Sequence, residues 1–244
     1  MTTAEGIRLQ KFLAQAGVGS RRHCEQLMER GHVSVNSEPA VQMGMRINPE
    51  TDIVHVDGVR IVAETNKRYL LFNKPVGVVC SMNDDQGRRD LSQYVAEHAE
   101  RLYHVGRLDT DTSGLLLFTN DGDLAHRMMH PGFEIEKTYV ALVKGTLKPA
   151  TLKQLLTGIE LEDGLAVADK ARILTTHDDS TLVELTIHMG RNRIVRRMFD
   201  HLGHPVIELS RTGFGPLRLG KLGIGSIREL KQSELGALLD KVGL

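Results

Sequence analysis

Hydrophobic and polar positions near the N-terminus predict two short helices followed by a small sheet. Helical spacing of apolar residues recurs over residues 7–16 and again over residues 20–31, with a break at Gly17-Val18-Gly19. Ser20 is a favourable N-cap for the second helix, and Gly31 fits its C-terminal end. Short apolar runs then predict strands at residues 33–35, 53–56 and 59–61, the last two joined by an Asp57-Gly58 hairpin turn.

A polar stretch over residues 64–68 separates this segment from a longer one. In the longer segment, apolar residues recur in some places at the spacing of a helix and in others at the spacing of a strand. These runs predict strands at residues 69–72, 78–80, 115–119, 138–143, 165–174 and 182–188. They predict helices at residues 91–98, 123–130, 147–156 and 192–202. Because strands and helices mix without a regular βαβ repeat, we expect an α+β fold with a mixed, mainly antiparallel sheet and flanking helices. The polar stretch is interpreted as a linker, which divides the chain into domains of residues 1–64 and 65–244.

Composition is typical of a folded protein from a reducing compartment. A hydrophobic fraction of 41% over 244 residues is enough to build packed cores. Cys24 and Cys80 lie far apart without a Cys-x-x-Cys pattern, which argues against a disulfide framework or a zinc site. Residues 1–10 lack the apolar core of a signal peptide, and no apolar run approaches the length of a membrane span. We therefore expect a soluble, cytoplasmic protein that does not contact a membrane.

Charge is balanced overall but unevenly distributed. The chain has 31 basic and 31 acidic residues, whereas residues 187–244 contain ten Lys and Arg against five Asp and Glu. A second basic group near the N-terminus consists of Arg8, Lys11, Arg21 and Arg22. Local patches decide whether a protein binds a polyanion, so nucleic acid is a candidate partner. An ordinary solvated surface explains each cluster equally well at this point.

The loop Gly106–Gly114, which precedes the predicted strand 115–119, concentrates the candidate chemistry. Asp109 and Asp111 fit the first positions of a calcium loop, but Asn120 stands where the twelfth-position glutamate belongs. An Asp-x-Asp pattern also occurs in magnesium-dependent phosphatases, with Asp109 as nucleophile and Asp111 as acid. In those enzymes the motif follows a hydrophobic strand, whereas here it precedes one.

A third interpretation needs a single ionised carboxylate and a cation to keep it charged, because an unpaired buried acid takes up a proton. The predicted helix 192–202 and the residue before it offer four candidate cations: Arg191, Arg193, Arg196 and Arg197. Arg193 and Arg196 would share one helical face at a spacing of three residues. A basic helix that only faces nucleic acid fits the same pattern, and one of the four side chains can still turn inward.

Resemblances to two known families cover most of the chain. The segments Arg8-Leu9, Lys11-Phe12, Ser20-Arg21-Arg22 and Gly31-His32-Val33-Ser34-Val35-Asn36 resemble the S4 RNA-binding domain. The Gly106-Arg107-Leu108-Asp109-x-x-Thr112-x-Gly114 core is similar to the central motif of pseudouridine synthases. Asn73-Lys74-Pro75-x-Gly77, Glu136-Lys137-Thr138-Tyr139 and the run from Gly190 to Phe199 agree with further motifs of that family in order and spacing. Together these segments resemble the subfamily that includes the small-subunit rRNA synthase and its large-subunit relatives.

The resemblance to pseudouridine synthases implies a role for each candidate residue. Asp109 is expected to be the nucleophile or proton-handling carboxylate that lets uracil detach from C1′, rotate and rejoin through C5. Arg196 is expected to pair with Asp109, and Tyr139 to stack on the base and assist proton removal at C5. On its position alone, Tyr139 would be an ordinary tyrosine packed in the core. Arg107 is expected to fill the gap left by the extruded uridine, whereas Asp111 occupies a variable position and receives no role.

RNA contacts are expected from Arg191, Arg193 and Arg197, and from Arg8, Lys11, Arg21 and Arg22 of the first domain. The chain departs from some relatives by having Asn192-Arg193 where those carry an aromatic-histidine or similar pair. The reaction is an isomerisation without a redox step or an external group, so neither a cofactor nor a metal is expected. Phosphate contacts can offset the few kcal/mol that extrusion of a base costs.

The sequence therefore predicts a monomeric pseudouridine synthase that acts on ribosomal RNA or a pre-ribosomal particle. Residues 102–139, with Met129-His130-Pro131 among them, are more similar to the large-subunit branch of that family, so the resemblance implies 23S rRNA as the substrate. A 16S rRNA synthase and a non-catalytic ribosome-associated RNA-binding protein are the alternatives, beside the phosphatase.

Overall fold

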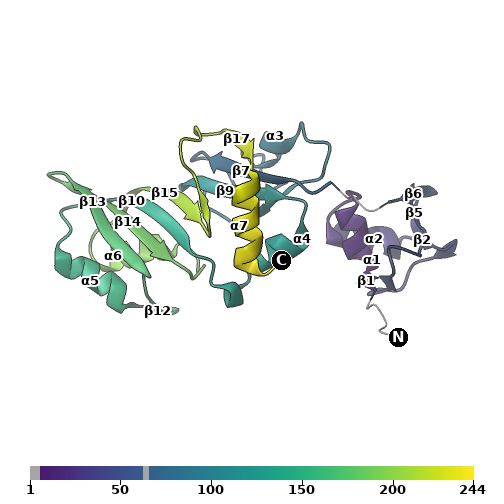
Figure 1. The fold of residues 1–244 in the computed structure, drawn as a ribbon, viewed down its shortest axis with the longest axis horizontal. Coiled ribbons are helices and arrows are strands. Elements are labelled where there is room, and N and C mark those ends of the chain that lie inside the picture. The colour runs from purple at the N-terminus through teal and green to yellow at the C-terminus, as the bar shows by residue number, and fades with distance from the viewer. Residues whose placement is uncertain (1–5, 63–65) are drawn as a thin grey trace. The chain divides into compact units, whose positions relative to one another are not determined.

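The computed structural model describes residues 6–62 and 66–244, which belong to two compact units (Figure 1). The N-terminal unit consists of the described residues up to Lys67 together with residues 99–101. The C-terminal unit consists of residues 68–98 and 102–244. The boundary predicted between residues 64 and 65 lies next to residues 63–65, which are outside the described ranges, so its position stays a prediction.

The N-terminal unit contains the predicted helix pair and hairpin. Helices α1 (Leu9–Gln15) and α2 (Arg21–Glu29) bury one face each, and the Ser20 side chain caps α2 by accepting a hydrogen bond from the His23 amide at 3.1 Å. Four strands follow in the order β3-β2-β5-β6, and a two-stranded sheet joins β1 (Ile7–Arg8) to β4 (Arg46–Ile47). The bounds of the four strands are β2 (Val33–Val35), β3 (Glu38–Pro39), β5 (Val54–Val56) and β6 (Val59–Ile61). The expected helices and hairpin are confirmed in this unit.

A nine-stranded sheet forms the centre of the C-terminal unit. Its main path is β13-β14-β10-β15-β9-β7-β17, with β8 attached to β9 and β16 to β15. The bounds are β7 (Tyr69–Lys74), β8 (Tyr103–Val105), β9 (Ser113–Thr119), β10 (Lys137–Lys144), β13 (Lys170–Thr176), β14 (Ser180–Ile187), β15 (Val206–Phe214), β16 (Leu217–Arg218) and β17 (Ile227–Glu229). All pairings in this sheet are antiparallel except β9 with β15. The predicted mixed, mainly antiparallel sheet is confirmed.

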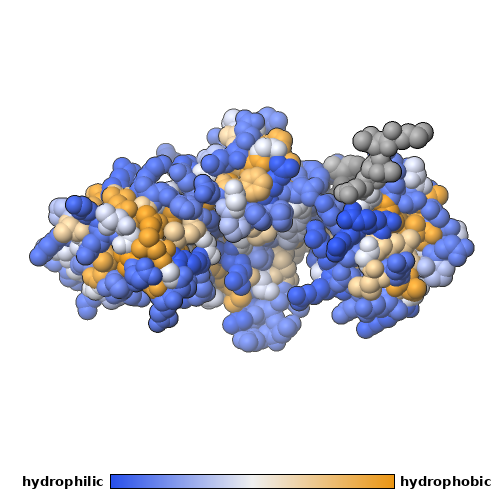
Figure 2. Space-filling view, turned by 90° about the horizontal axis from the view of Figure 1, so that it is seen from below, coloured by the Kyte–Doolittle hydropathy of each residue, from blue (hydrophilic) through white to orange (hydrophobic). Residues whose placement is uncertain are grey.

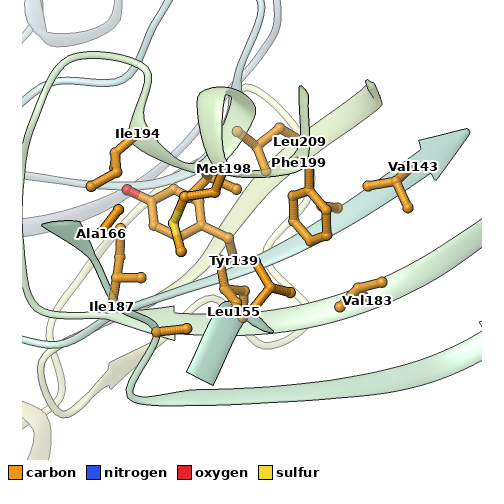
Figure 3. Packing of buried hydrophobic residues seen from close by; sticks show 14 of the residues in the cluster. Tyr139, Val143, Leu155, Ala166, Val183, Ile187, Ile194, Met198, Phe199 and Leu209 are labelled. Carbon is orange, nitrogen blue, oxygen red and sulfur yellow. The ribbon is translucent and has the colours of Figure 1, made fainter. Parts of the chain in front are cut away.

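Helices pack against this sheet and bury three separate apolar clusters. The helices are α3 (Ser92–Val95), α4 (Gly122–Met129), α5 (Pro149–Thr157), α6 (Ile194–His201) and α7 (Gln232–Val242), with a 3-10 turn at Pro131–Phe133 and a small hairpin of β11 (Ile159–Leu161) and β12 (Gly164–Ala166). One cluster combines residues of α5 and α6 with those of β10 and β14 (Figure 3). A second lies between α4, α7 and the strands β7 and β9. The third combines Val95 of α3 with other residues of β7 and β9. Hydrophobic residues also reach the surface in patches between hydrophilic ones, as Figure 2 shows.

Two of the predicted strands are corrected by the structure. Residues 78–80 form no strand, since only Val79 makes an isolated bridge, to Asp90. The strand expected at 165–174 is divided, because β12 ends at Ala166 and β13 begins at Lys170. Strands β15 and β17 and helix α7 were not predicted from the apolar pattern.

The parallel pair β9·β15 requires a glycine where the two strands meet. Only two residue pairs join these strands, Ser113 with Ser210 and Gly114 with Arg211. Gly114 has φ +110°, and a Cβ atom there would come within 2.6 Å of the Arg211 backbone nitrogen. No residue with a side chain fits this approach. The junction therefore depends on the last glycine of the Gly106–Gly114 loop and holds that loop against β15.

Candidate active site

A cleft of about 1590 Å³ in the C-terminal unit brings most of the predicted site residues together. Its lining includes Asp109, Tyr139, Arg107, Arg191 and Arg193. Arg196 and Arg197 are not among the lining residues, although both belong to α6 beside the cleft wall. The four predicted RNA contacts Arg8, Lys11, Arg21 and Arg22 belong to the N-terminal unit.

Backbone contacts hold the Asp109 segment in a fixed turn. The Thr112 amide donates to the Asp109 carbonyl at 3.0 Å, and the Gly77 amide donates to the Thr110 carbonyl at 2.7 Å. Leu108 and Thr112 are buried on either side of the turn. The Asp109 side chain keeps 34% of its surface exposed, so its carboxylate faces an open cleft rather than the dry pocket expected from the sequence. A substrate base can therefore reach this carboxylate from the cleft.

Arg196 does not form the ion pair with Asp109 that the sequence led us to expect. Its Nη2 atom donates to the Asp111 backbone oxygen at 2.8 Å and lies 3.3 Å from the Asp111 carboxylate. Its Nη1 atom donates to the Val206 carbonyl at 3.3 Å. The side chain is only 9% exposed, so these contacts fix it beside Asp111.

Arg193 is the arginine nearest to Asp109. Its Nη1 atom lies 3.7 Å from Asp109 Oδ2, while its Nη1 and Nη2 atoms donate to the Asp111 carboxylate at 3.2 and 3.0 Å. The hydrogen bonds from Arg193 are the main reason why the pKa of Asp111 is below its usual range. Burial raises this pKa, and the charge of Arg196 lowers it further. Asp111, to which the sequence assigned no role, is thus the shared anchor of two arginines.

Arg191 and Arg197 point to a different carboxylate. Asp163, in the turn between β11 and β12, accepts hydrogen bonds from Arg191 at 2.9 Å and from Arg197 at 2.9 and 2.8 Å. These bonds, led by those from Arg197, lower the pKa of Asp163. The four arginines predicted as one group therefore divide into two pairs with separate partners.

Tyr139 belongs both to the core and to the cleft. It is 9% exposed and packs in the cluster that contains Met198 and Ile194 of α6 (Figure 3). On β10 it pairs with Leu185 of β14 on one side and with Arg211 of β15 on the other. Since Tyr139 also lines the cleft, the packed and the base-stacking interpretations are compatible.

Sequence reasoning missed two further cations of the cleft, Lys137 and Arg211. Lys137 Nζ donates to the carbonyls of Ile135 and His188 at 2.9 and 2.7 Å. Burial first, and then the charge of Arg211, lower the pKa of Lys137 to about 8, against a smaller opposing effect of Asp169. Arg211 is 2% exposed, and its Nε donates to the Leu115 carbonyl at 2.9 Å. The apolar pattern gave no signal for Arg211, because polar residues interrupt the strand β15 to which it belongs.

Lys74 of the family-like turn Asn73–Gly77 is a buried structural residue. Its Nζ atom donates to the carbonyls of Val78 and Pro75 at 2.8 and 2.9 Å, and its exposed fraction is zero. Burial lowers the pKa of Lys74, with nearby Cys80, Asp109 and Asp111 opposing that shift. The lysine therefore holds the turn that supports Thr110 through Gly77.

Comparisons with known proteins identify the family to which these features belong. Residues 68–201 match the RNA pseudouridylate synthase family, and residues 7–53 match the S4 domain. The chain belongs to the RNA pseudouridylate synthase family and carries an N-terminal S4 domain. Within residues 6–62 and 66–244, no cluster of three or more His, Cys, Asp or Glu side chains is arranged to hold a metal ion. Over the same residues, no helix is long and apolar enough to cross a membrane.

Individual relatives agree with this assignment over nearly the full length. An uncharacterized RNA pseudouridine synthase of Mycobacterium tuberculosis (strain ATCC 25618 / H37Rv) is 46% identical over 98% of this chain and 95% of its own length. The ribosomal large subunit pseudouridine synthase B of Bacillus subtilis (strain 168) is 43% identical over 95% of each chain. A crystal structure of a pseudouridylate synthase superposes with a TM-score of 0.67 at 31% identity, covering 95% of this chain and 99% of the other.

Proposed function

We propose that this protein converts a specific uridine of large-subunit ribosomal RNA to pseudouridine. The open cleft that joins Asp109 and Tyr139, with basic residues around it, carries this proposal. Support for the large subunit comes from the Bacillus subtilis relative, whose name assigns it to that subunit. We further propose a monomer that acts in the cytoplasm on rRNA or an assembling particle, with the domain boundary near residue 64.

The proposed reaction exchanges one bond of the nucleotide for another. The bond between C1′ and N1 breaks, the uracil rotates, and a bond forms between C1′ and C5. The hydrogen at C5 leaves and N1 gains a proton, so no oxidant, reductant or transferred group is needed. Asp109 is the carboxylate that promotes detachment, and Tyr139 stacks on the base and assists removal of the C5 proton.

Arginines provide the remaining contacts of the proposal. Arg196 holds the Asp109–Asp111 turn through the Asp111 backbone oxygen. Arg107, at the rim of the same cleft, fills the space that the extruded uridine leaves in the RNA. Arg191 and Arg197 bind phosphates by exchanging Asp163 for the RNA backbone, and Arg8, Lys11, Arg21 and Arg22 bind RNA from the S4 domain.

Replacing Asp109 by asparagine tests the catalytic assignment. Asp109→Asn should lower the rate of pseudouridine formation by about 1000-fold or more, because the amide is neither a nucleophile nor a base. RNA affinity should stay within a few-fold, since the substitution leaves the basic surface intact. The substrate is rRNA from a strain without the gene, and carbodiimide-dependent stops of reverse transcription map the product. Retained turnover in the variant would contradict the role of Asp109.

The same assay decides between the proposed function and its alternatives. A single new stop in large-subunit rRNA after treatment with the wild-type protein supports the proposal. A stop in 16S rRNA would assign the enzyme to the small subunit. Binding without any new stop would identify a non-catalytic RNA-binding protein that retains the fold.

A further inference from the structure

Arg193 occupies a position that its expected role in RNA binding does not explain. Its guanidinium lies between the two carboxylates of the Gly106–Gly114 loop, and Nη1 is shared by Asp111 Oδ1 at 3.2 Å and Asp109 Oδ2 at 3.7 Å. Both terminal nitrogens of Arg193 bond to Asp111. Arg191 and Arg197 are bound to a carboxylate as well, but Arg193 differs from them in lying 3.7 Å from Asp109.

The backbone of Arg193 is also unusual. Arg193 has φ +46° and ψ 30°, the left-handed region that residues with a Cβ atom rarely adopt, and it forms the N-cap of α6 without a side-chain cap. Its carbonyl accepts the Arg197 amide at 3.0 Å and so begins the helix. Conformations of this kind persist where the surrounding contacts fix them, and they cluster at functional sites.

Arg196 cannot take the place of Arg193 beside Asp109. Its guanidinium is held by Asp111 and by the Val206 carbonyl, and no ion pair within the described ranges joins it to Asp109. Arg191 and Arg197 are bound to Asp163. Among the four arginines of this group, all of which the structure describes, Arg193 alone has the Asp109 carboxylate within ion-pair distance.

We propose that Arg193 is the positioning residue that orients Asp109 for the isomerisation, and that Asp111 anchors Arg193 in this position. The inference rests on the proposed function, because it assigns a partner to the proposed catalytic carboxylate. The bidentate pair with Asp111 fixes the planar guanidinium before RNA arrives. The longer contact with Asp109 leaves the oxygens of that carboxylate free for the substrate while the positive charge stays close. Asp111 thus positions Asp109 through Arg193.

Substitutions of Arg193 separate this role from RNA binding. The probe is rRNA from a strain without the gene, labelled with tritium at C5 of uridine, so that each isomerisation releases tritium to water. Single-turnover reactions with excess enzyme give the rate at saturation and the enzyme concentration at half-saturation. Arg193→Gln should lower the saturated rate by about 100-fold and change the half-saturation concentration less than about twofold. Arg193→Lys keeps the positive charge without the planar guanidinium. Its saturated rate should be about tenfold higher than that of Arg193→Gln.

Asp111→Asn is the second variant, because it removes the anchor and leaves Arg193 in place. It should also lower the saturated rate, by about tenfold, with little effect on half-saturation. Arg172→Gln is the matched control, since Arg172 pairs with Glu184 at 2.8 Å on β13 and does not line the cleft. This control should match the wild type in both parameters. Thermal unfolding of each variant establishes that it is folded.

Four results would overturn the inference. If Arg193→Gln raised the half-saturation concentration with an unchanged saturated rate, Arg193 would be an RNA contact. If Asp111→Asn kept the wild-type rate, the anchor would not be needed. If the wild-type protein released no tritium from this RNA, the proposed function would fail, and this inference with it. Activity of the wild type together with a normal rate of Arg193→Gln would overturn the inference alone.

Discussion

At the scale of single residues, two aspartates two positions apart have different surroundings and therefore different tasks. Asp111 accepts bonds from two arginines, and these hold its pKa low and its carboxylate in place. Asp109 has one cation, at 3.7 Å, and its side chain is 34% exposed against 47% for Asp111, so the contacts rather than the exposure distinguish the two. A carboxylate that accepts hydrogen bonds from cations is a weaker nucleophile and base, because those bonds stabilise its charge. The environment therefore selects Asp109 for chemistry and Asp111 for structure.

Lys137 gives a pH-dependent prediction at the same scale. Its pKa is about 8 in the folded protein, whereas the unfolded chain keeps this proton up to the ordinary pKa of 10.5. Between these values the unfolded state binds more protons, so this group makes the free energy of unfolding rise with pH. Lys137→Met removes the group. The stability of the wild type relative to the variant should therefore increase from about pH 7 to about pH 9.5.

Urea unfolding of both proteins at a series of pH values in this range measures that difference. Glu136→Gln serves as a control for a change of charge at the neighbouring position. A difference between wild type and Lys137→Met that stays constant with pH would show that the burial of Lys137 does not shift its titration.

The sequence located Asp109 and Tyr139 in one site but could not identify the arginine beside Asp109. Helical spacing placed Arg193 and Arg196 on one face, as the i, i+3 rule states. That rule applies only inside a helix, and Arg193 is the left-handed residue that precedes α6. Both guanidiniums nevertheless reach Asp111, and the spacing does not tell which of them also lies near Asp109. Where a helix begins is decided by backbone geometry that the apolar pattern does not encode.

At the scale of elements, the pair β9·β15 determines where the site forms. Most strands of the sheet were predicted because their apolar runs are long. Strand β15 was missed because Ser210, Arg211 and Thr212 interrupt its apolar residues. Ser210 and Arg211 lie where the strand pairs with β9, and Arg211 also lines the cleft. The residues that make this strand part of the site are thus the ones that conceal it from a hydrophobic pattern.

Gly114→Ala tests the importance of this junction. Alanine at φ +110° is strained, and its Cβ would press on the Arg211 backbone, so β9 and β15 should separate locally. The free energy of unfolding should fall by about 2 to 4 kcal/mol, and activity should fall further than stability alone explains. Urea unfolding and single-turnover assays at a temperature where the variant is folded measure both quantities.

Gly236→Ala is a suitable control for that substitution. Gly236 lies inside α7, where an added Cβ meets no neighbouring atom, so alanine should leave stability unchanged or raise it by up to about 1 kcal/mol. If Gly114→Ala behaved like Gly236→Ala, the close approach of β9 and β15 would not matter for the fold or the site.

At the scale of the whole molecule, the S4 match over residues 7–53 falls in one compact unit, and the pseudouridylate synthase match over residues 68–201 falls mainly in the other. The net charge of zero concealed the candidate RNA surfaces, because acids and bases are distributed unevenly between segments. Both units could be predicted since each carries several spaced motifs.

The first turn of α2 allows the proposed RNA role of the S4 domain to be tested through two opposite effects. Arg21 and Arg22 are exposed cations at the positive end of the helix dipole, which costs about 0.3 to 1 kcal/mol each. A docked phosphate would reverse that effect. In the double variant Arg21→Gln/Arg22→Gln, thermal stability of the S4 domain should rise and affinity for rRNA should fall several-fold. Filter binding at several salt concentrations should also show a salt slope smaller by about one to two units.

Arg30→Gln, at the opposite end of α2, is the control. It should lower stability, because a cation at the C-terminal end interacts favourably with the helix dipole. Unchanged affinity and salt slope in the double variant would show that these two arginines do not bind RNA.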